Sequence, residues 1–88
     1  MKVSFTSDGW DDFCHWIEAD RKVLVRIKRL ISESSRHPFE GIGKPEPLRG
    51  QLAGWWSRRI DKEHRLVYRI EGTGAEAVLT IAQCRYHY

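Results

Sequence analysis

The sequence predicts an α+β fold in which two N-terminal antiparallel helices pack on one face of a twisted, mostly antiparallel sheet of four or five strands. Apolar residues recur at helical spacing through the first third of the chain, and short β-prone segments with alternating side chains dominate after residue 54. The chain has 88 residues, of which 41% are hydrophobic and 31% charged. This balance is typical of a folded protein, and we expect a single domain over residues 1–88.

The first expected elements are a strand and a helix. Lys2–Thr6 alternates in polarity and is β-prone. Ser7 or Asp8 is expected to cap the helix that follows, because short polar side chains accept hydrogen bonds from the free amides of a first helical turn. The apolar stripe of this helix is formed by Trp10, Phe13, Cys14 and Ile17.

A second helix is expected after Asp20, which is suited to cap it. Its side chains divide into an apolar face (Val23, Leu24, Ile27, Leu30 and Ile31) and a basic face (Lys22, Arg26 and Arg29). The serines of Ser32–Ser35 and the His37-Pro38 step are expected to end the helix, since a residue before proline disfavours the α conformation.

The remaining chain is predicted to be one long loop followed by three strands. His37–Gly54 contains all three prolines and four of the seven glycines, and loops of this length are often functional. Strands are expected at Trp55–Ile60, His64–Glu71 and Ala77–Cys84, with turns at residues 61–63 and 72–74. In the middle strand, one face should pack on the helices (Leu66, Tyr68 and Ile70) and the other should be open (Arg65, Val67 and Arg69).

Charge and composition narrow the possible functions. The net charge is +3, but residues 1–20 carry one lysine and five carboxylates, whereas residues 21–44 carry seven basic and two acidic residues. A basic body suits a polyanion or an acidic protein partner, and charge does not distinguish the two. No apolar run could span a membrane, no signal peptide is apparent, and two cysteines form no disulfide framework. We therefore expect a cytoplasmic protein without a membrane partner.

No motif for a metal or cofactor is present, and we expect neither. Cys14-His15 and the Cys84–His87 spacing match no known zinc-ligand pattern, and Walker, dinucleotide and nucleophile-elbow motifs are absent. The residues left for chemistry are Glu46 between two prolines, the arginines, and His87.

These residue types suit metal-independent cleavage of RNA. In that reaction the 2′-OH attacks the neighbouring phosphate, which requires a base, cations around the phosphate, and an acid for the leaving 5′-oxygen. Taken singly, Glu46 is an ordinary loop carboxylate, Arg65 a surface strand residue and His87 part of a chain end. Composition allows the chemistry without establishing it, and leaves open whether Glu46 or His87 accepts the first proton.

Longer strings of residues are more specific. The chain contains PFEG at 38–41, GKPEPL at 43–48, WSRRI at 56–60, EHRLVY at 63–68 and CRYHY at 84–88, together with WDD at 10–12. These strings closely resemble the YoeB (Txe/YoeB) toxins of the RelE superfamily. The resemblance extends over the whole chain, including an ending at the same His-Tyr pair.

The resemblance implies a RelE-like fold and a toxin of a type II toxin–antitoxin system. It implies ribosome-dependent cleavage of mRNA in the decoding site, which inhibits translation, and usually a homodimer. The expected partners are the ribosome, mRNA and a cognate antitoxin of the YefM kind with an acidic C-terminal tail. Operator DNA is an expected partner only of the toxin–antitoxin complex, which would repress its own operon.

The resemblance also implies roles for individual residues. The catalytic set would be Glu46 as general base, Arg65 as phosphate-stabilising cation, His87 as general acid and Tyr88 in support. Arg49, Arg59 and Lys44 would contact RNA or phosphate. Arg49 stands where a lysine is expected in this family, which keeps the charge and alters its geometry.

Two other functions remain open at this point. A gyrase-poisoning toxin of the same fold would act without nuclease chemistry, and such proteins generally lack the Glu/Arg/His set. A non-catalytic nucleic-acid-binding module would use the basic face alone and would not need the terminal His87-Tyr88 pair. In vitro translation distinguishes cleaved mRNA from blocked supercoiling and from binding without product.

Overall fold

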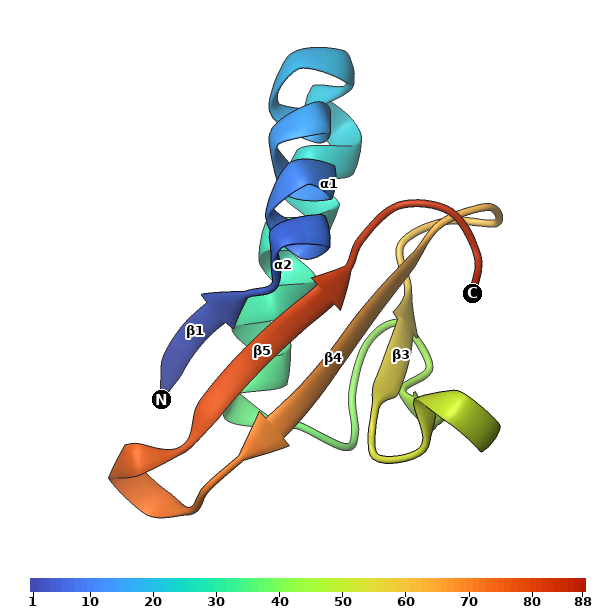
Figure 1. Ribbon diagram of the computed structural model, residues 1–88. Coiled ribbons are helices and arrows are strands. Elements are labelled where there is room, and N and C mark those ends of the chain that lie inside the picture. The colour runs from blue at the N-terminus through green and yellow to red at the C-terminus, as the bar shows by residue number, and fades with distance from the viewer.

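The computed structural model describes all residues, 1–88, and contains two helices packed against a five-stranded sheet (Figure 1). The elements are β1 (Lys2–Phe5), α1 (Ser7–Ala19), α2 (Arg21–Arg36), β2 (Glu46–Pro47), β3 (Trp56–Arg59), β4 (Arg65–Glu71) and β5 (Val78–Gln83). Short 3-10 turns lie at Gly50–Leu52 and Gly74–Glu76. The predicted α+β fold is confirmed. No helix is both long and apolar enough to cross a membrane.

The strand order in the sheet is β1-β5-β4-β3-β2. All neighbouring strands are antiparallel except β1 and β5, which run parallel and place the first strand beside the last (Figure 1). The short strand β2 lies within the segment predicted to be a loop. It forms because Glu46 and Pro47 pair with Ser57 and Trp56 at the sheet edge, where a proline is tolerated.

The hydrophobic core lies between the helices and one face of the sheet. Leu66 and Tyr68 of β4 and Leu79 and Ile81 of β5 are fully buried in it. The helices contribute Trp16, Ile27 and Leu30 to the same cluster. Both helices therefore cover the same face of the sheet, as the alternation in β4 predicted. The opposite face is not covered by a helix.

The cap of α1 differs from the prediction. Thr6, and not Ser7 or Asp8, is the N-cap residue, since its Oγ1 accepts a hydrogen bond from the Gly9 amide at 3.0 Å. The same hydroxyl donates to the Ala82 carbonyl, so the cap also ties the helix to β5. Asp20 caps α2 as predicted, accepting from the amides of residues 22 and 23.

The end of α2 also differs from the prediction. Residues 32–35 are helical, and α2 continues to Arg36. Ser34 is buried and donates to the Leu30 carbonyl at 2.7 Å, so its hydroxyl is satisfied inside the helix. Only the step before Pro38 ends the helix, with His37 as its last cap.

Gly9 allows α1 to contact the backbone of β5. A Cβ at this position would collide with the Ile81 carbonyl oxygen and lie 3.2 Å from the Ala82 carbonyl carbon. Gly9→Ala should therefore destabilise the protein by about 1–3 kcal/mol, although alanine ordinarily stabilises a helix relative to glycine. Urea unfolding measures the change. Glu18→Ala, at an exposed position of the same helix, is the control and should be nearly neutral; equal stability of the two variants would contradict the close contact.

Candidate active site

The sheet face opposite the helices carries three of the predicted site residues, Glu46, Arg59 and Arg65, in adjacent rows. Glu46, Ser57 and Val67 pair in register across β2, β3 and β4. Arg59 and Arg65 pair with each other two residues further along the same face. The carboxylate and the two guanidiniums thus originate about 7 Å apart along the strands.

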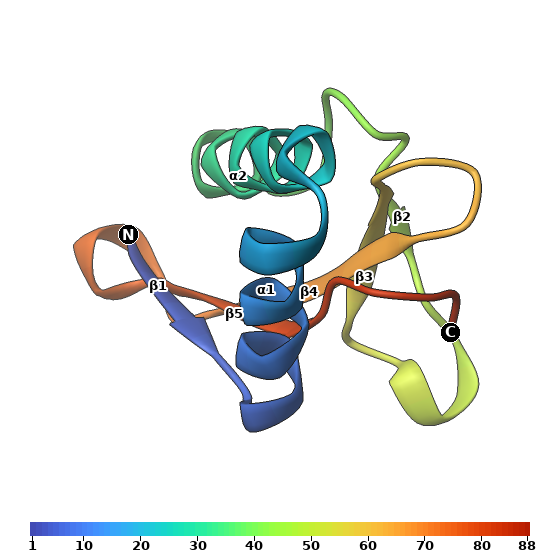
Figure 2. The same ribbon diagram turned by 90° about the horizontal axis from the view of Figure 1, so that it is seen from above.

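Residues 85–88 cross this face. After β5 they run over β4 toward β3, on the side of β4 opposite to α2 (Figures 1 and 2). The Arg65 amide donates to the Tyr86 carbonyl at 3.0 Å, and the Tyr86 amide donates to His64 Nδ1 at 2.7 Å. These two bonds hold the segment beside the start of β4.

Tyr88 brings the end of this segment to Glu46. Its hydroxyl donates to Glu46 Oε1 at 3.2 Å and lies 3.1 Å from Ser57 Oγ. An ionised carboxylate only accepts, and a phenol has a single proton, so Ser57 must be the donor in the second bond. The hydrogen bonds therefore run from Ser57 through Tyr88 to Glu46.

Arg65 is not openly exposed, contrary to the prediction of an open arginine face. The residue is only 9% exposed, and its Nη1 donates to the carbonyls of Asp61 and His64 at 2.7 and 3.0 Å. Val67 on the same face is also buried. The reason is that the turn before β4 and residues 85–88 fold over this part of the sheet. Arg65 is consequently held in place by backbone carbonyls.

A shallow basic hollow adjoins Arg65. It is lined by Arg26, Arg59, Ile60, Asp61, Lys62 and Arg65. Arg26 reaches it from α2 and donates to the carbonyls of Arg59 and Ile60 at 3.2 and 3.4 Å. Four cations beside one carboxylate make this hollow suited to a phosphate group.

The other predicted residues lie around this centre. Lys44 is exposed in a left-handed conformation, with φ of 51°, just before β2. Arg49 is exposed after β2. His87 is exposed, with its ring 4.8 Å from that of Tyr88, and its Nδ1 lies 3.2 Å from the Tyr88 carbonyl oxygen. The structure therefore brings Glu46 and Tyr88 into direct contact, and leaves Lys44, Arg49 and His87 exposed to solvent.

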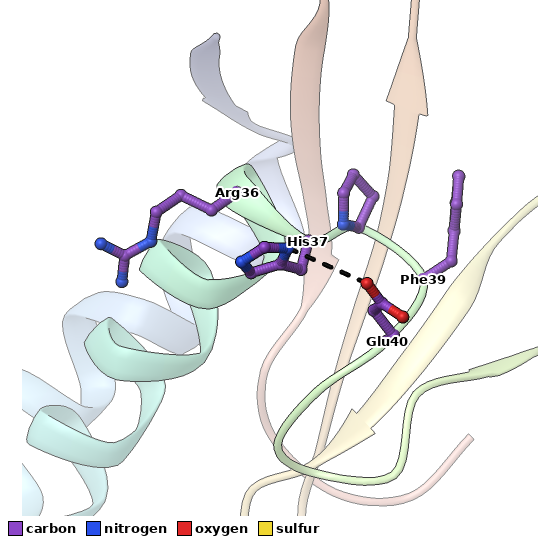
Figure 3. A pocket seen from close by; sticks show the side chains of 5 residues that line it. Arg36, His37, Phe39 and Glu40 are labelled. Atoms are coloured by element: carbon purple, nitrogen blue, oxygen red, sulfur yellow. Dashed lines mark ion pairs between the residues drawn. The ribbon is translucent and has the colours of Figure 1, made fainter.

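Arg58 holds the loop that leads to Glu46. This arginine is fully buried, and its guanidinium donates to the carbonyls of His37, Glu40 and Ile42 and to the Tyr68 hydroxyl. Because its guanidinium is buried and bonds only to groups of the fold itself, we assign Arg58 a structural role. Residues 36–40 line a separate hollow, where His37 and Glu40 face each other at 4.0 Å (Figure 3). That hollow contains none of the predicted site residues.

Helix α1 fixes the point where residues 85–88 leave the sheet. The Cys84 carbonyl accepts from Trp16 Nε1 at 2.8 Å, and the Cys84 amide donates to Asp12 Oδ2 at 3.1 Å. Burial raises the pKa of the Cys84 thiol to about 12, with a further contribution from Asp12, so this thiol is unreactive at neutral pH. Burial also raises the pKa of Asp12 above 3.8, outweighing the Cys84 hydrogen bond and the nearby Arg85.

Asp12 should make stability depend on pH. Because its pKa is raised on folding, its favourable contribution is complete below the unfolded pKa and is lost as pH rises through the folded pKa. Asp12→Asn never ionises, so its stability relative to the wild type should increase between about pH 3 and about pH 7. Urea unfolding at both pH values measures this difference. Asp11→Asn, at an exposed neighbouring position, is the control; a pH-independent difference for Asp12→Asn would contradict the burial effect.

Several contributing residues were not singled out from the sequence. Ser57 and His64 lie within strings that carry the family resemblance, but no role was assigned to either. Lys62 belongs to no motif, and Arg26 was predicted only as part of a basic helix face. Ser57 and His64 become relevant through partners distant in sequence, Tyr88 and Tyr86. Arg26 and Lys62 become relevant because they line the basic hollow. No three His, Cys, Asp or Glu side chains lie together in a possible metal-ligand set.

Comparisons with known protein sequences point to one family. Residues 5–88 match the model of the family described as the YoeB-like toxin of bacterial type II toxin–antitoxin systems. Toxin YoeB of Streptomyces coelicolor is 57% identical over 88 residues, covering 100% of both chains. Toxin YoeB of Escherichia coli is 49% identical, again over 100% of both chains.

Solved structures give the same result for the fold. The YoeB/ParE toxin from Agrobacterium tumefaciens superposes with a TM-score of 0.95 at 49% identity, covering 100% of both chains. The YoeB dimer from Staphylococcus aureus superposes with a TM-score of 0.88 at 37% identity, covering 100% of this chain and 98% of that one. A YoeB-YefM complex from the same organism gives 0.88 at 36% identity, with the same coverage.

Proposed function

The chain belongs to the family of YoeB-like toxins of type II toxin–antitoxin systems, and on that premise we propose that it is a ribosome-dependent endoribonuclease. It inhibits translation by cutting mRNA in the decoding site. The observation that carries the proposal is the contact between Glu46 and Tyr88 on the sheet face that also bears Arg59 and Arg65. A carboxylate beside fixed cations is suited to general acid–base cleavage of a phosphodiester.

In the proposed reaction the 2′-OH of the substrate is the nucleophile. Glu46 accepts its proton as the oxygen attacks the adjacent phosphorus, while Arg65 stabilises the charge on the pentacoordinate phosphate. The bond to the 5′-oxygen breaks, and His87 protonates this leaving group. The products are a 2′,3′-cyclic phosphate and a 5′-OH, and the reaction requires neither a protein nucleophile nor a cofactor.

The positions of these side chains support their roles. The carbonyls that hold Arg65 fix its guanidinium before substrate arrives, which limits reorganisation in the transition state. His87 is exposed beside Tyr88, where its ring is accessible to a leaving group. Tyr88 orients the Glu46 carboxylate, and Arg59, Arg49 and Lys44 are placed to contact the RNA backbone.

The partners follow from the same proposal. Staphylococcus aureus YoeB has been solved as a dimer and in complex with YefM. We extend both properties to this chain: a homodimer that is neutralised by an acidic YefM-like antitoxin, with operator DNA bound only by the complex. The basic hollow offers an acidic partner its electrostatic complement. Cleavage would take place in the cytoplasm, where ribosomes translate.

The test is a reconstituted translation reaction with purified ribosomes and one defined mRNA. The proposal predicts mRNA fragments, mapped by primer extension, only when ribosomes and toxin are both present. Intact mRNA with inhibited gyrase supercoiling would identify the gyrase-poisoning alternative instead. Binding of RNA without any product would identify a non-catalytic module.

A further inference from the structure

His64 lies at the junction of the core and residues 85–88. It is the only buried histidine of the four, with 8% exposure. Its ring lies edge-on to that of Trp16 in α1, at 4.8 Å, and 5.9 Å from that of Tyr86. Its backbone amide is fixed by Asp61 Oδ1 at 2.7 Å. The two neighbouring rings and the fixed backbone amide therefore limit the movement of this imidazole.

The hydrogen bond to Tyr86 determines the tautomer of this imidazole. His64 Nδ1 accepts from the Tyr86 amide at 2.7 Å, so Nδ1 carries no proton and the neutral ring is protonated at Nε2. Nε2 points toward Glu63 Oε1, at 3.8 Å. The hydrogen bond from the Tyr86 amide to His64 therefore forms only with the tautomer that has its proton on Nε2.

Tyr86 adopts a conformation that needs such support. Its φ is +64°, in the left-handed region that tyrosine rarely occupies. His64 accepts its amide, and the next residue, Arg65, donates to its carbonyl. Two consecutive residues therefore satisfy both backbone polar groups of Tyr86 and hold the bend.

We propose that His64 is a positioning residue for the active site, because its Nδ1 holds the bend at Tyr86 that directs Tyr88 to Glu46. The inference rests on the proposed nuclease function. Residues 85–88 are anchored first at Cys84 by α1 and then at Tyr86 by His64, which leaves two residues to bring the Tyr88 hydroxyl to Ser57 and Glu46. Without the second anchor, Tyr88 and His87 lose their fixed position.

Two substitutions of similar polarity separate this role from a general packing role. Asn places its Oδ1 where His64 has Nδ1, whereas Gln places its oxygen one bond further out. His64→Asn should retain the bond to the Tyr86 amide and keep kcat within about threefold of wild type, and His64→Gln should lower kcat at least about tenfold, because misplacement of about 1 Å can cost about 10²-fold. KM for programmed ribosomes should change little in either variant, since the basic hollow is intact.

The structural readout is independent of catalysis. In wild-type protein labelled with ¹⁵N, a scalar coupling across the hydrogen bond should connect the Tyr86 amide nitrogen with His64 Nδ1. Hydrogen exchange of the Tyr86 amide should remain slow in His64→Asn and become fast in His64→Gln, while the amides of Tyr68 and Ile81 in the sheet stay protected in both variants. That pattern shows that the fold is intact and only the bend is released.

The outcomes separate this inference from the proposed function. The positioning role would be overturned if the Tyr86 amide of His64→Gln stayed protected from exchange. It would also be overturned if that amide exchanged fast while kcat stayed at the wild-type value. If His64→Asn did not retain both the protection of the Tyr86 amide and the wild-type kcat, the assignment of the role to Nδ1 would be overturned. A wild-type protein that leaves mRNA intact on ribosomes would overturn the nuclease function, and the amide measurements would still decide whether His64 holds the bend.

Discussion

Glu46→Gln should lower mRNA cleavage by about 10²-fold or more, because it removes the carboxylate proposed to accept the 2′-OH proton. Gln keeps the volume of the side chain and an oxygen that can accept from the Tyr88 hydroxyl, so the fold and the position of residues 85–88 should be preserved. Single-turnover cleavage on programmed ribosomes gives the rate, and urea unfolding verifies stability. His87→Gln should give a loss of the same order by removing the proposed general acid.

The control for Glu46→Gln is Glu40→Gln. Glu40 is an exposed carboxylate in the same loop, it faces His37 at 4.0 Å, and it lies outside the candidate site. This variant changes the net charge of the protein equally and should cleave at the wild-type rate. Wild-type cleavage by folded Glu46→Gln would remove Glu46 from the mechanism.

A single 2′-deoxy nucleotide at the scissile position of the mRNA should abolish cleavage, which makes it the largest expected effect. The substrate then lacks the nucleophile, and no side chain of the protein is proposed to replace it. Binding of the mRNA to the ribosome should be unchanged, and filter retention of the complex verifies this. The unmodified mRNA should yield a 2′,3′-cyclic phosphate, or its opened 3′-phosphate, together with a 5′-OH.

A 2′-deoxy substitution several nucleotides away from the scissile position is the matched control and should leave cleavage intact. Enzyme washed with EDTA should equal untreated enzyme when magnesium is supplied only to keep the ribosome assembled. Efficient cutting of the scissile 2′-deoxy substrate, or a 5′-phosphate on the downstream fragment, would contradict the mechanism even for a protein that blocks translation.

Most of the fold could be predicted because most elements have their own periodic pattern. The apolar stripes of the two helices and the alternation in β4 are properties of neighbouring residues. Four of the five observed strands lie within one residue of the predicted ones, whereas β2 was predicted to be part of a loop. The cap at Thr6 was missed because its choice depends on contact with Ala82 across the sheet. The extension of α2 through Ser34 was missed because its hydroxyl is satisfied within the helix.

The arrangement of the site could be predicted less well from local sequence patterns. Arg58 and Arg59 are adjacent arginines, yet strand alternation buries the first in the core and exposes the second. The burial of Arg65 depends on the turn at Asp61 and on Tyr86, which no local pattern specifies. Ser57 and His64 act through partners 31 and 22 residues away. Resemblance to a family identified the candidate residues, and only the structure connected them.

The parallel pairing of β1 with β5 has a consequence for synthesis of the chain. Lys2–Phe5 emerges from a ribosome before its partner strand, Val78–Gln83, which follows more than seventy residues later. Until then β1 has no neighbour, and the contact of Tyr88 with Glu46 is also unmade. The sheet of a nascent chain therefore stays incomplete through most of its translation, and we expect the proposed active site to form only once nearly the whole chain has emerged.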